Sequence, residues 1–339
     1  MASVLRSISI LCIFLIIHMI ISLADGGGVG INYGLVADNL PPPSQVVNLL
    51  KSRNIARVRL FSPDTDVLDA LQNSGIEVII GTFDADVLTL ANHPDFAKAW
   101  VQVKIVPYVQ TITFRCIAIG NEVIPGNMTS FVFAAIQNMN AALQSFNLGQ
   151  IPVSTPVALS ALATSSPPST GDFSSDVKPA MQQIAGFLAN NNFPLLITAY
   201  PYFAYVSQPG SISLPFVQFT SPGVVVWDGA LGYTNMFDAM VDAVYSALEK
   251  IGAGGVEVVI CESGWPSQGN GDFTTIQLAQ TYNQNLVKHV LSSGTPKRPN
   301  NNVETYVFAL FNEDQKSPGV EQHFGLFYPD MTEVYHVDF

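Results

Sequence analysis

The chain has 339 residues, only 12% of them charged, and its 26 acidic against 14 basic side chains give a formal net charge of -12. Such a chain carries no basic stripe to neutralise phosphates, which argues against nucleic acid as a partner. The length fits two average domains or one barrel of alternating strands and helices.

The N-terminal segment 1–24 is expected to be a secretory signal peptide. Arg6 is followed by an almost wholly apolar stretch over residues 8–23, and Ser22 and Ala24 are small residues suited to a cleavage site. A membrane anchor is the alternative, but the stretch is near the lower length limit for crossing a bilayer. We therefore expect a secreted chain that starts near Asp25 and makes no stable membrane association.

From residue 29 onward, short apolar runs alternate with longer stretches of helical periodicity. An apolar run of about five residues predicts a buried strand. Eight strands are expected, over residues 29–33, 57–61, 77–82, 114–120, 151–155, 195–200, 256–262 and 305–311. Helices are expected over residues 44–52, 66–73, 129–146, 177–190, 235–251 and 275–292.

Eight strands that alternate with helices predict an α/β fold, a single-domain (β/α)8 TIM barrel over residues 25–339. A doubly wound open sheet is the alternative, and the glycines within residues 26–30 would suit it. These glycines precede the first predicted strand, however, whereas a dinucleotide-binding fingerprint follows a strand. The barrel is therefore the better interpretation.

Two glutamates, Glu122 and Glu262, stand at the ends of the predicted fourth and seventh strands. Each alone could be the first polar residue of a loop. In a TIM barrel, however, catalytic groups come from the C-terminal ends of strands. Two carboxylates that face one another suit glycoside hydrolysis, in which one protonates the leaving oxygen and the other attacks or activates water. A separation of about 5 Å would indicate retention, and roughly 6.5 to 9.5 Å inversion.

Cys116 and Cys261 lie in these same two strands. Secretion would permit a disulfide, but strands so distant in order are not expected to be neighbours, so we predict two buried free thiols. The five histidines are scattered along the sequence, so no metal site is expected. Asn127 begins an Asn-Met-Thr acceptor and is the candidate glycosylation site.

Several motifs carry a family resemblance: Gly120-Asn121-Glu122-Val123, Glu262-Ser263-Gly264-Trp265-Pro266 and Phe311-Asn312-Glu313-Asp314-Gln315-Lys316. Together with Tyr200-Pro201-Tyr202-Phe203 and His323-Phe324-Gly325-Leu326-Phe327, they resemble the plant β-1,3-glucanases of glycoside hydrolase family 17. The resemblance implies a retaining barrel enzyme without a cofactor, acting on internal bonds of callose or fungal wall glucan in the plant cell wall (apoplast). It implies that Glu122 is the acid/base and Glu262 the nucleophile. A monomer is expected.

The resemblance also implies supporting residues near the site. Asn121 is expected to position the sugar 2-hydroxyl or the nucleophile. Lys316 and its partner Glu313, with the acidic Glu321, match family positions near the cleft, and surface ion pairs are the alternative interpretation. An acid/base needs a raised pKa, which burial and Glu262 would give to Glu122, whereas Glu262 needs a cation or hydrogen-bond donors to stay ionised.

Aromatic rings supply flat apolar faces on which glucose can stack. The candidates are Tyr33, Tyr200, Tyr202, Phe203, Trp265 and Phe311, and packing in the core is the alternative for each. The chain departs from the family at Phe61 (usually Tyr), Thr198 (usually Asn) and Trp227 (commonly Gln), which leaves subsite preference open. A non-hydrolytic glucan-binding wall protein and a β-glucan transglycosylase remain as alternative functions.

Overall fold

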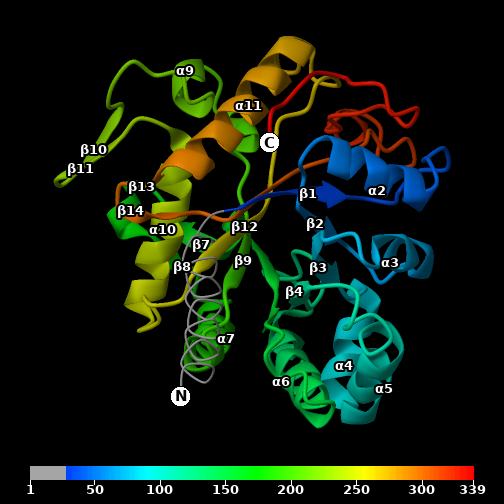
Figure 1. The fold of residues 1–339 in the computed structure, drawn as a ribbon. Helices are drawn as coiled ribbons and strands as arrows, with labels where there is room; N and C mark the ends of the chain where they lie inside the picture. Colours follow the sequence, from blue (N-terminus) through cyan, green and yellow to red (C-terminus); the bar gives the residue numbers. More distant parts are fainter. Residues whose placement is uncertain (1–27) are drawn as a thin grey trace, which may run out of the picture.

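The structure is a computed structural model that describes residues 28–339, and the predicted signal peptide lies outside the described residues. Its main sheet is parallel throughout and closes into a barrel (Figure 1). Around the barrel the order is β5 (Val153–Ser154), β4 (Phe114–Ala118), β3 (Glu77–Gly81), β2 (Arg57–Leu60), β1 (Val29–Tyr33), β15 (Thr305–Val307), β12 (Val258–Ser263), β9 (Leu195–Thr198) and β6 (Pro156–Ala158).

The fifth barrel strand is divided into two short segments. β5 pairs with β4 and β6 pairs with β9, and only Thr155 separates them. The two ends of the sheet therefore belong to one continuous stretch of chain, which closes the barrel. Counted this way, the eight predicted strands and the (β/α)8 barrel are confirmed.

Helices surround the outside of the sheet (Figure 1). They are α2 (Pro43–Ser52), α3 (Thr65–Leu71), α4 (Val87–Asn92), α5 (Pro94–Lys104), α6 (Thr129–Ser145), α7 (Lys178–Asn191), α8 (Pro201–Ser207), α9 (Leu214–Val217), α10 (Met236–Lys250) and α11 (Ile276–Ser292). Side-chain caps fix some of their starts, because Asp64 accepts from Val67 N at 3.0 Å and Asn235 accepts from Asp238 N at 2.8 Å. None of the helices within residues 28–339 is long and apolar enough to cross a membrane.

The sequence analysis missed four of these helices, namely α4, α5, α8 and α9. Three of them, α4, α8 and α9, have seven residues at most, and only His93 separates α4 from α5, which begins at Pro94. Pieces this short show too few turns for a 3.6-residue period to stand out. Short 3-10 helices also lie in the connections: η1 (Asp84–Asp86), η2 (Leu159–Ala161), η3 (Pro168–Thr170), η4 (Gly271–Phe273) and η5 (Val320–Gln322).

Seven buried, mostly aliphatic and thiol side chains form a cluster inside the barrel. The cluster contains Ile79, Cys116, Ala118, Leu196, Val259, Cys261 and Tyr306, which alternate with outward-facing residues along their strands. Both cysteines are free and fully buried, so the prediction of two free thiols is confirmed. The barrel is therefore a packed core rather than a pore.

Three two-stranded antiparallel hairpins decorate the barrel. They are β7 (Leu162–Thr164) with β8 (Asp172–Phe173), β10 (Val226–Asp228) with β11 (Leu231–Tyr233), and β13 (Gly294–Thr295) with β14 (Arg298–Asn302). The first two follow β6 and β9, so they belong to the strand-to-helix connections at the C-terminal end of the barrel. Asp228 joins these two connections, accepting hydrogen bonds from the Ser169 amide at 2.6 Å and its hydroxyl at 2.7 Å.

Candidate active site

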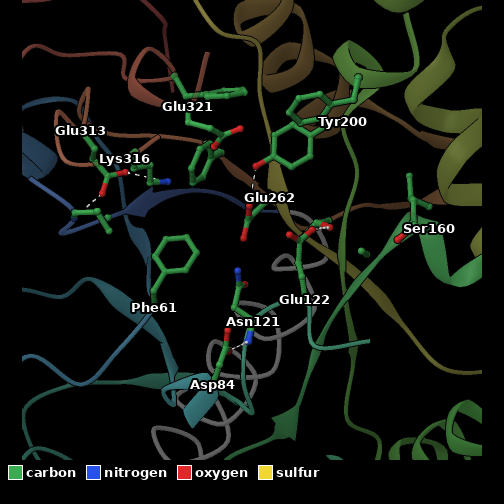
Figure 2. A pocket seen from close by; sticks show the side chains of 18 of the residues that line it. Phe61, Asp84, Asn121, Glu122, Ser160, Tyr200, Glu262, Glu313, Lys316 and Glu321 are labelled. Carbon is green, nitrogen blue, oxygen red and sulfur yellow. Dashed lines mark hydrogen bonds and ion pairs between the residues drawn. The ribbon is translucent and has the colours of Figure 1, made fainter. Parts of the chain in front are cut away.

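A cleft of about 1180 Å3 opens at the C-terminal end of the barrel strands. Figure 2 shows the Glu122 and Glu262 side chains within it, pointing toward one another from different elements. The structure brings nine of the predicted site residues into the cleft lining: Tyr33, Asn121, Glu122, Tyr200, Phe203, Glu262, Glu313, Lys316 and Glu321. Residues almost 300 positions apart in the sequence thus share one surface.

Glu262 lies within strand β12 and is buried. Arg59 Nη1 donates a hydrogen bond to its Oε1 at 2.5 Å, and Tyr200 Oη donates to its Oε2 at 2.7 Å. Both carboxylate oxygens are therefore held in place. A full positive charge and two donors stabilise the ionised form of a carboxylate, which is the form that a nucleophile requires.

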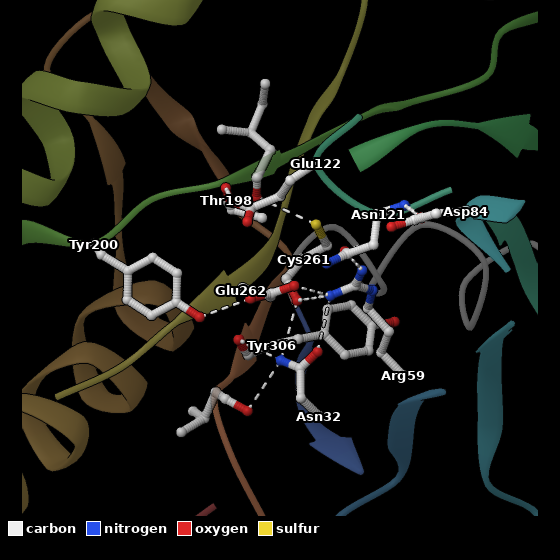
Figure 3. A network of polar contacts seen from close by, with 12 residues as sticks. Asn32, Arg59, Asp84, Asn121, Glu122, Thr198, Tyr200, Cys261, Glu262 and Tyr306 are labelled. Atoms are coloured by element: carbon white, nitrogen blue, oxygen red, sulfur yellow. Dashed lines mark hydrogen bonds and ion pairs between the residues drawn. The ribbon is translucent and has the colours of Figure 1, made fainter. Parts of the chain in front are cut away.

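Arg59 is the functional residue that the sequence analysis missed. It is buried on β2, and besides Glu262 it donates to Asn121 Oδ1 at 2.5 Å and to Asn32 Oδ1 at 3.1 Å (Figure 3). Its guanidinium carbon lies 4.4 Å from the ring centroid of Phe61, a cation–π arrangement. A charged residue inside an apolar strand was the available signal, because a buried charge requires a partner.

Glu122 stands on a turn rather than in a strand. It follows the end of β4 by four positions and has φ +53°, the left-handed region that non-glycine residues seldom adopt. Neighbouring hydrogen bonds fix this turn: Asn121 N donates to Asp84 Oδ1 at 2.6 Å, and Gly120 N donates to Thr82 Oγ1 at 3.0 Å. The strained turn directs the Glu122 side chain into the cleft.

The surroundings of Glu122 favour its protonated form. Part of the residue is open to solvent, but desolvation of its carboxyl in the cleft, followed by the negative charge of Glu262, raises the pKa of Glu122. Glu321 adds a smaller effect in the same direction, while a hydrogen bond from the Thr198 hydroxyl to Oε1 and the charge of Arg59 oppose it. The rise and its causes agree with what an acid/base needs.

Glu313 and Lys316 do more than form a surface ion pair. Lys316 Nζ lies 3.3 Å from Glu313 Oε2 and 4.4 Å from the ring centroid of Phe308. Glu313 is buried, and its Oε1 accepts a hydrogen bond from Val36 N at 2.7 Å. The pair therefore ties the C-terminal loop to the connection after β1 and fixes one wall of the cleft.

The structure places only three of the six candidate stacking rings in the cleft lining, and their stacking on a sugar stays a prediction. Tyr33, Tyr200 and Phe203 line the cleft. Tyr202, Trp265 and Phe311 are buried, with exposures of 1%, 0% and 2%, and they are absent from the lining. These three rings pack behind the wall instead.

The buried rings have partners that leave no face for a sugar. The Tyr202 and Trp265 ring centroids are 5.0 Å apart, and Trp265 Nε1 donates to Phe273 O at 2.9 Å. The Tyr202 centroid lies 5.1 Å from that of Phe203, so the buried ring supports an exposed one. Lining rings that the sequence analysis did not select are Phe61, Phe83, Phe308 and Phe324.

Two further predictions concern glycosylation and metal binding rather than the residues of the cleft. Asn127 is exposed in the connection between β4 and α6, and its glycosylation stays a prediction. Within the part of the chain that the structure describes, His, Cys, Asp and Glu side chains nowhere gather in a group of three or more that could hold a metal ion.

Comparison with known proteins agrees with this geometry. Residues 29–339 match the family model for glycosyl hydrolases family 17. A glucan endo-1,3-beta-glucosidase from Pisum sativum is 43% identical over 341 residues, which cover 98% of this chain and 91% of that protein. The match is therefore to whole relatives rather than to a shared fragment.

Two solved structures superpose on the whole barrel. The beta-1,3-glucanase and pollen allergen CJP38 of Cryptomeria japonica has a TM-score of 0.89 and 48% identity, covering 92% of this chain and 98% of that chain. A plant beta-glucan endohydrolase, from a study of two with distinct substrate specificities, has a TM-score of 0.88 and 42% identity, covering 91% of this chain and 100% of that chain. With the family model matched over nearly the full described length, this chain belongs to glycosyl hydrolase family 17.

Proposed function

We propose that the chain is a secreted, endo-acting, retaining glycoside hydrolase that cleaves internal β-1,3-glucosidic bonds of glucans such as callose and fungal wall glucan. The observation that carries the proposal is the unequal support of two carboxylates in one cleft. Arg59 and Tyr200 donate hydrogen bonds to the two oxygens of the Glu262 carboxylate, while the pKa of Glu122 is raised. Unequal environments of this kind assign acid and nucleophile roles.

The chemistry follows from these assignments in two steps. Protonated Glu122 gives its proton to the glycosidic oxygen as a Glu262 oxygen attacks the anomeric carbon, which breaks the glycosidic bond and forms a covalent glucosyl-enzyme. Glu122, now ionised, then takes a proton from water as the water attacks the same carbon and releases Glu262. We expect the two carboxyl groups to lie about 5 Å apart, as retention requires.

Direct assays test the proposal. The mature chain should release reducing ends from laminarin, and Glu262→Gln should remove this activity almost completely, while the exposed control Asp95→Asn on α5 should leave it intact. Proton NMR of the first product should show the β-anomer, which is the mark of retention. A parent chain without activity on laminarin, or a Glu262→Gln variant as active as the parent, would overturn the assignment.

A removed acid/base leaves a specific signature. Glu122→Ala should lose activity on laminarin but keep the first step on an aryl β-laminaribioside with a good leaving group, because such a group departs without protonation. Added azide should then yield a β-glycosyl azide. If azide gives no product while activity on both substrates is lost equally, Glu122 is not the acid/base.

Substrate range and location need separate measurements. The family includes plant endohydrolases of distinct specificities, so digestion of laminarin beside barley-type mixed-linkage glucan, with linkage analysis, decides between the two substrates. Products longer than the substrate would reveal transglycosylation, and binding without turnover would indicate the non-hydrolytic alternative. Secretion predicts that the chain recovered from the medium begins near Asp25, outside the described residues, and size-exclusion chromatography tests the expected monomer.

A further inference from the structure

An exposed tryptophan stands on the β10–β11 hairpin, away from the catalytic carboxylates. Trp227 is 66% exposed, and the adjoining Val224 and Val225 are 40% and 46% exposed. Figure 1 shows this hairpin projecting from the body of the barrel at the upper left. Exposed apolar side chains that gather in one place commonly mark a binding surface, whereas single ones do not.

The hairpin holds the indole as a flat platform. Trp227 is directly opposite Gly232 in the antiparallel ladder. A Cβ on Gly232 would lie 2.8 Å from Val224 and 3.1 Å from the Trp227 ring, so both side chains lie over the glycine backbone. A ring supported in this way loses little freedom when a ligand stacks on it.

The other face of β10 anchors the hairpin to the protein. Successive strand residues point to opposite faces, so Asp228 points away from the side that Trp227 occupies. Asp228 is held by the amide and the hydroxyl of Ser169 in the β7–β8 connection. The platform is therefore fixed, and its free face is turned to solvent.

The chain connects this platform to the cleft. The hairpin lies between β9 and α10, at the C-terminal end of the barrel. The same connection supplies Phe203 and Ser207 of the cleft lining just before the hairpin, and Met240 just after it. A polymer leaving that side of the cleft stays at the end of the barrel where the hairpin projects.

The chemistry of the surface selects a neutral sugar polymer. Asp228 is the only charged residue within positions 218–235, and its carboxylate is occupied by Ser169. The net charge of -12 disfavours phosphate-rich polymers and anionic membranes. An uncharged indole face instead suits the apolar face of a pyranose ring.

We propose that Trp227, together with Val224, forms a secondary binding site for a β-glucan chain outside the catalytic cleft. The inference rests on the proposed function, since it takes the substrate polymer as the ligand. Such a site retains the enzyme on long or insoluble glucan, whereas a short oligosaccharide that fills only the cleft gains nothing from it.

Binding is tested by measuring how much protein insoluble β-1,3-glucan (curdlan) removes from solution. The parent and every variant carry Glu262→Gln in this assay, which prevents digestion. We expect Trp227→Ala to weaken binding about three- to tenfold, as loss of an aromatic stacking contact implies. Trp227→Tyr, which keeps a ring, should stay within about twofold of the parent by the same reasoning. Leu291→Ala, which removes another exposed apolar side chain on α11, is the matched control and should bind as the parent does.

Hydrolysis with Glu262 intact provides a second measurement, and the ratio of curdlan to laminarihexaose turnover should fall in Trp227→Ala. Equal curdlan binding by parent and Trp227→Ala overturns the inference, as does a parent that does not bind curdlan. So does a parent that is dimeric by light scattering when Trp227→Ala is monomeric, since the platform would then be an interface between copies. In each of these cases the proposed function still holds if the parent hydrolyses laminarin. If the parent does not hydrolyse laminarin, the proposed function is refuted separately.

Discussion

The hydrogen bond from Thr198 to Glu122 predicts a measurable change in pH dependence. Thr198 is buried at the end of β9, and its hydroxyl donates to Glu122 Oε1 (Figure 3). The bond stabilises the ionised carboxylate and so lowers the pKa of Glu122, against the stronger effects of desolvation and Glu262, which raise it. Thr198→Val keeps the shape of the side chain and removes the donor, so the pKa of Glu122 should rise further.

The size of the change follows from the type of bond. A hydrogen bond to a charged group contributes about 1.5 to 3 kcal/mol, and one pKa unit corresponds to about 1.4 kcal/mol. Because Glu122 is partly open to the cleft, solvent screens the contact, and we take the lower end of that range. The expected rise is therefore about one pKa unit.

The dependence of kcat/KM on pH measures this rise in the free enzyme. Glu122 must be protonated to act as the acid, so its ionisation produces the alkaline limb of the profile. In Thr198→Val this limb should move to higher pH by about one unit while the acidic limb stays in place, and Thr198→Ser should restore the parent profile. An alkaline limb that is unmoved, or that moves to lower pH in a variant with parental Tm, would refute the reasoning.

Three further predictions concern other parts of the molecule. Arg59→Lys should lower kcat about 10- to 200-fold, because a lysine lacks the fork that binds Glu262 and Asn121 together; a loss below threefold would contradict this. Phe203→Ala should raise KM for laminarin about three- to tenfold with little change in kcat, since the exposed ring contributes binding alone, and an unchanged KM would contradict it. Burial raises the pKa of Asp242 to about 6, so the folded state holds a proton that the unfolded chain has lost. Stability should therefore fall by about 2 kcal/mol as pH rises from about 4 to 6, and Asp242→Asn should flatten this slope in urea titrations, whereas equal slopes would count against it.

The sequence was sufficient where a short-range pattern decides the structure. Apolar runs located the barrel strands, and the polar residue after each run located Glu122 and Glu262 at the correct end of the barrel. The division of the fifth strand was not foreseen, because an apolar run does not show which neighbour each half pairs with. That pairing depends on closure between β4 and β9, a long-range property.

The misplaced aromatic residues show a different limit. Tyr202 and Phe203 are adjacent, and Phe203 reaches the cleft while Tyr202 packs against Trp265. Both residues follow the end of β9, so the sequence motif predicts the same location for both. Only the packing of α8 against its surroundings determines that Phe203 lines the cleft wall and that Tyr202 lies in the core. Arg59 was missed for a related reason, since its partner Glu262 lies on β12 and its partner Asn121 lies in the turn after β4, and neither of these strands adjoins β2.

The contrast between the two glutamates lies in their supporting backbone as much as in their neighbours. Glu262 belongs to a parallel strand flanked by β9 and β15, so its backbone is fixed on both sides, and its carboxylate meets the buried donor Arg59 and the half-buried donor Tyr200. Glu122 belongs to a turn with positive φ, outside the sheet, where the carboxyl reaches the open cleft and bonds one hydroxyl. A nucleophile must keep its charge and its position, whereas an acid/base must gain and lose a proton within each cycle. The strand suits the first requirement, because it holds the Glu262 carboxylate against the charge of Arg59. The turn suits the second requirement, because it leaves one carboxyl oxygen of Glu122 free to meet the substrate and then water.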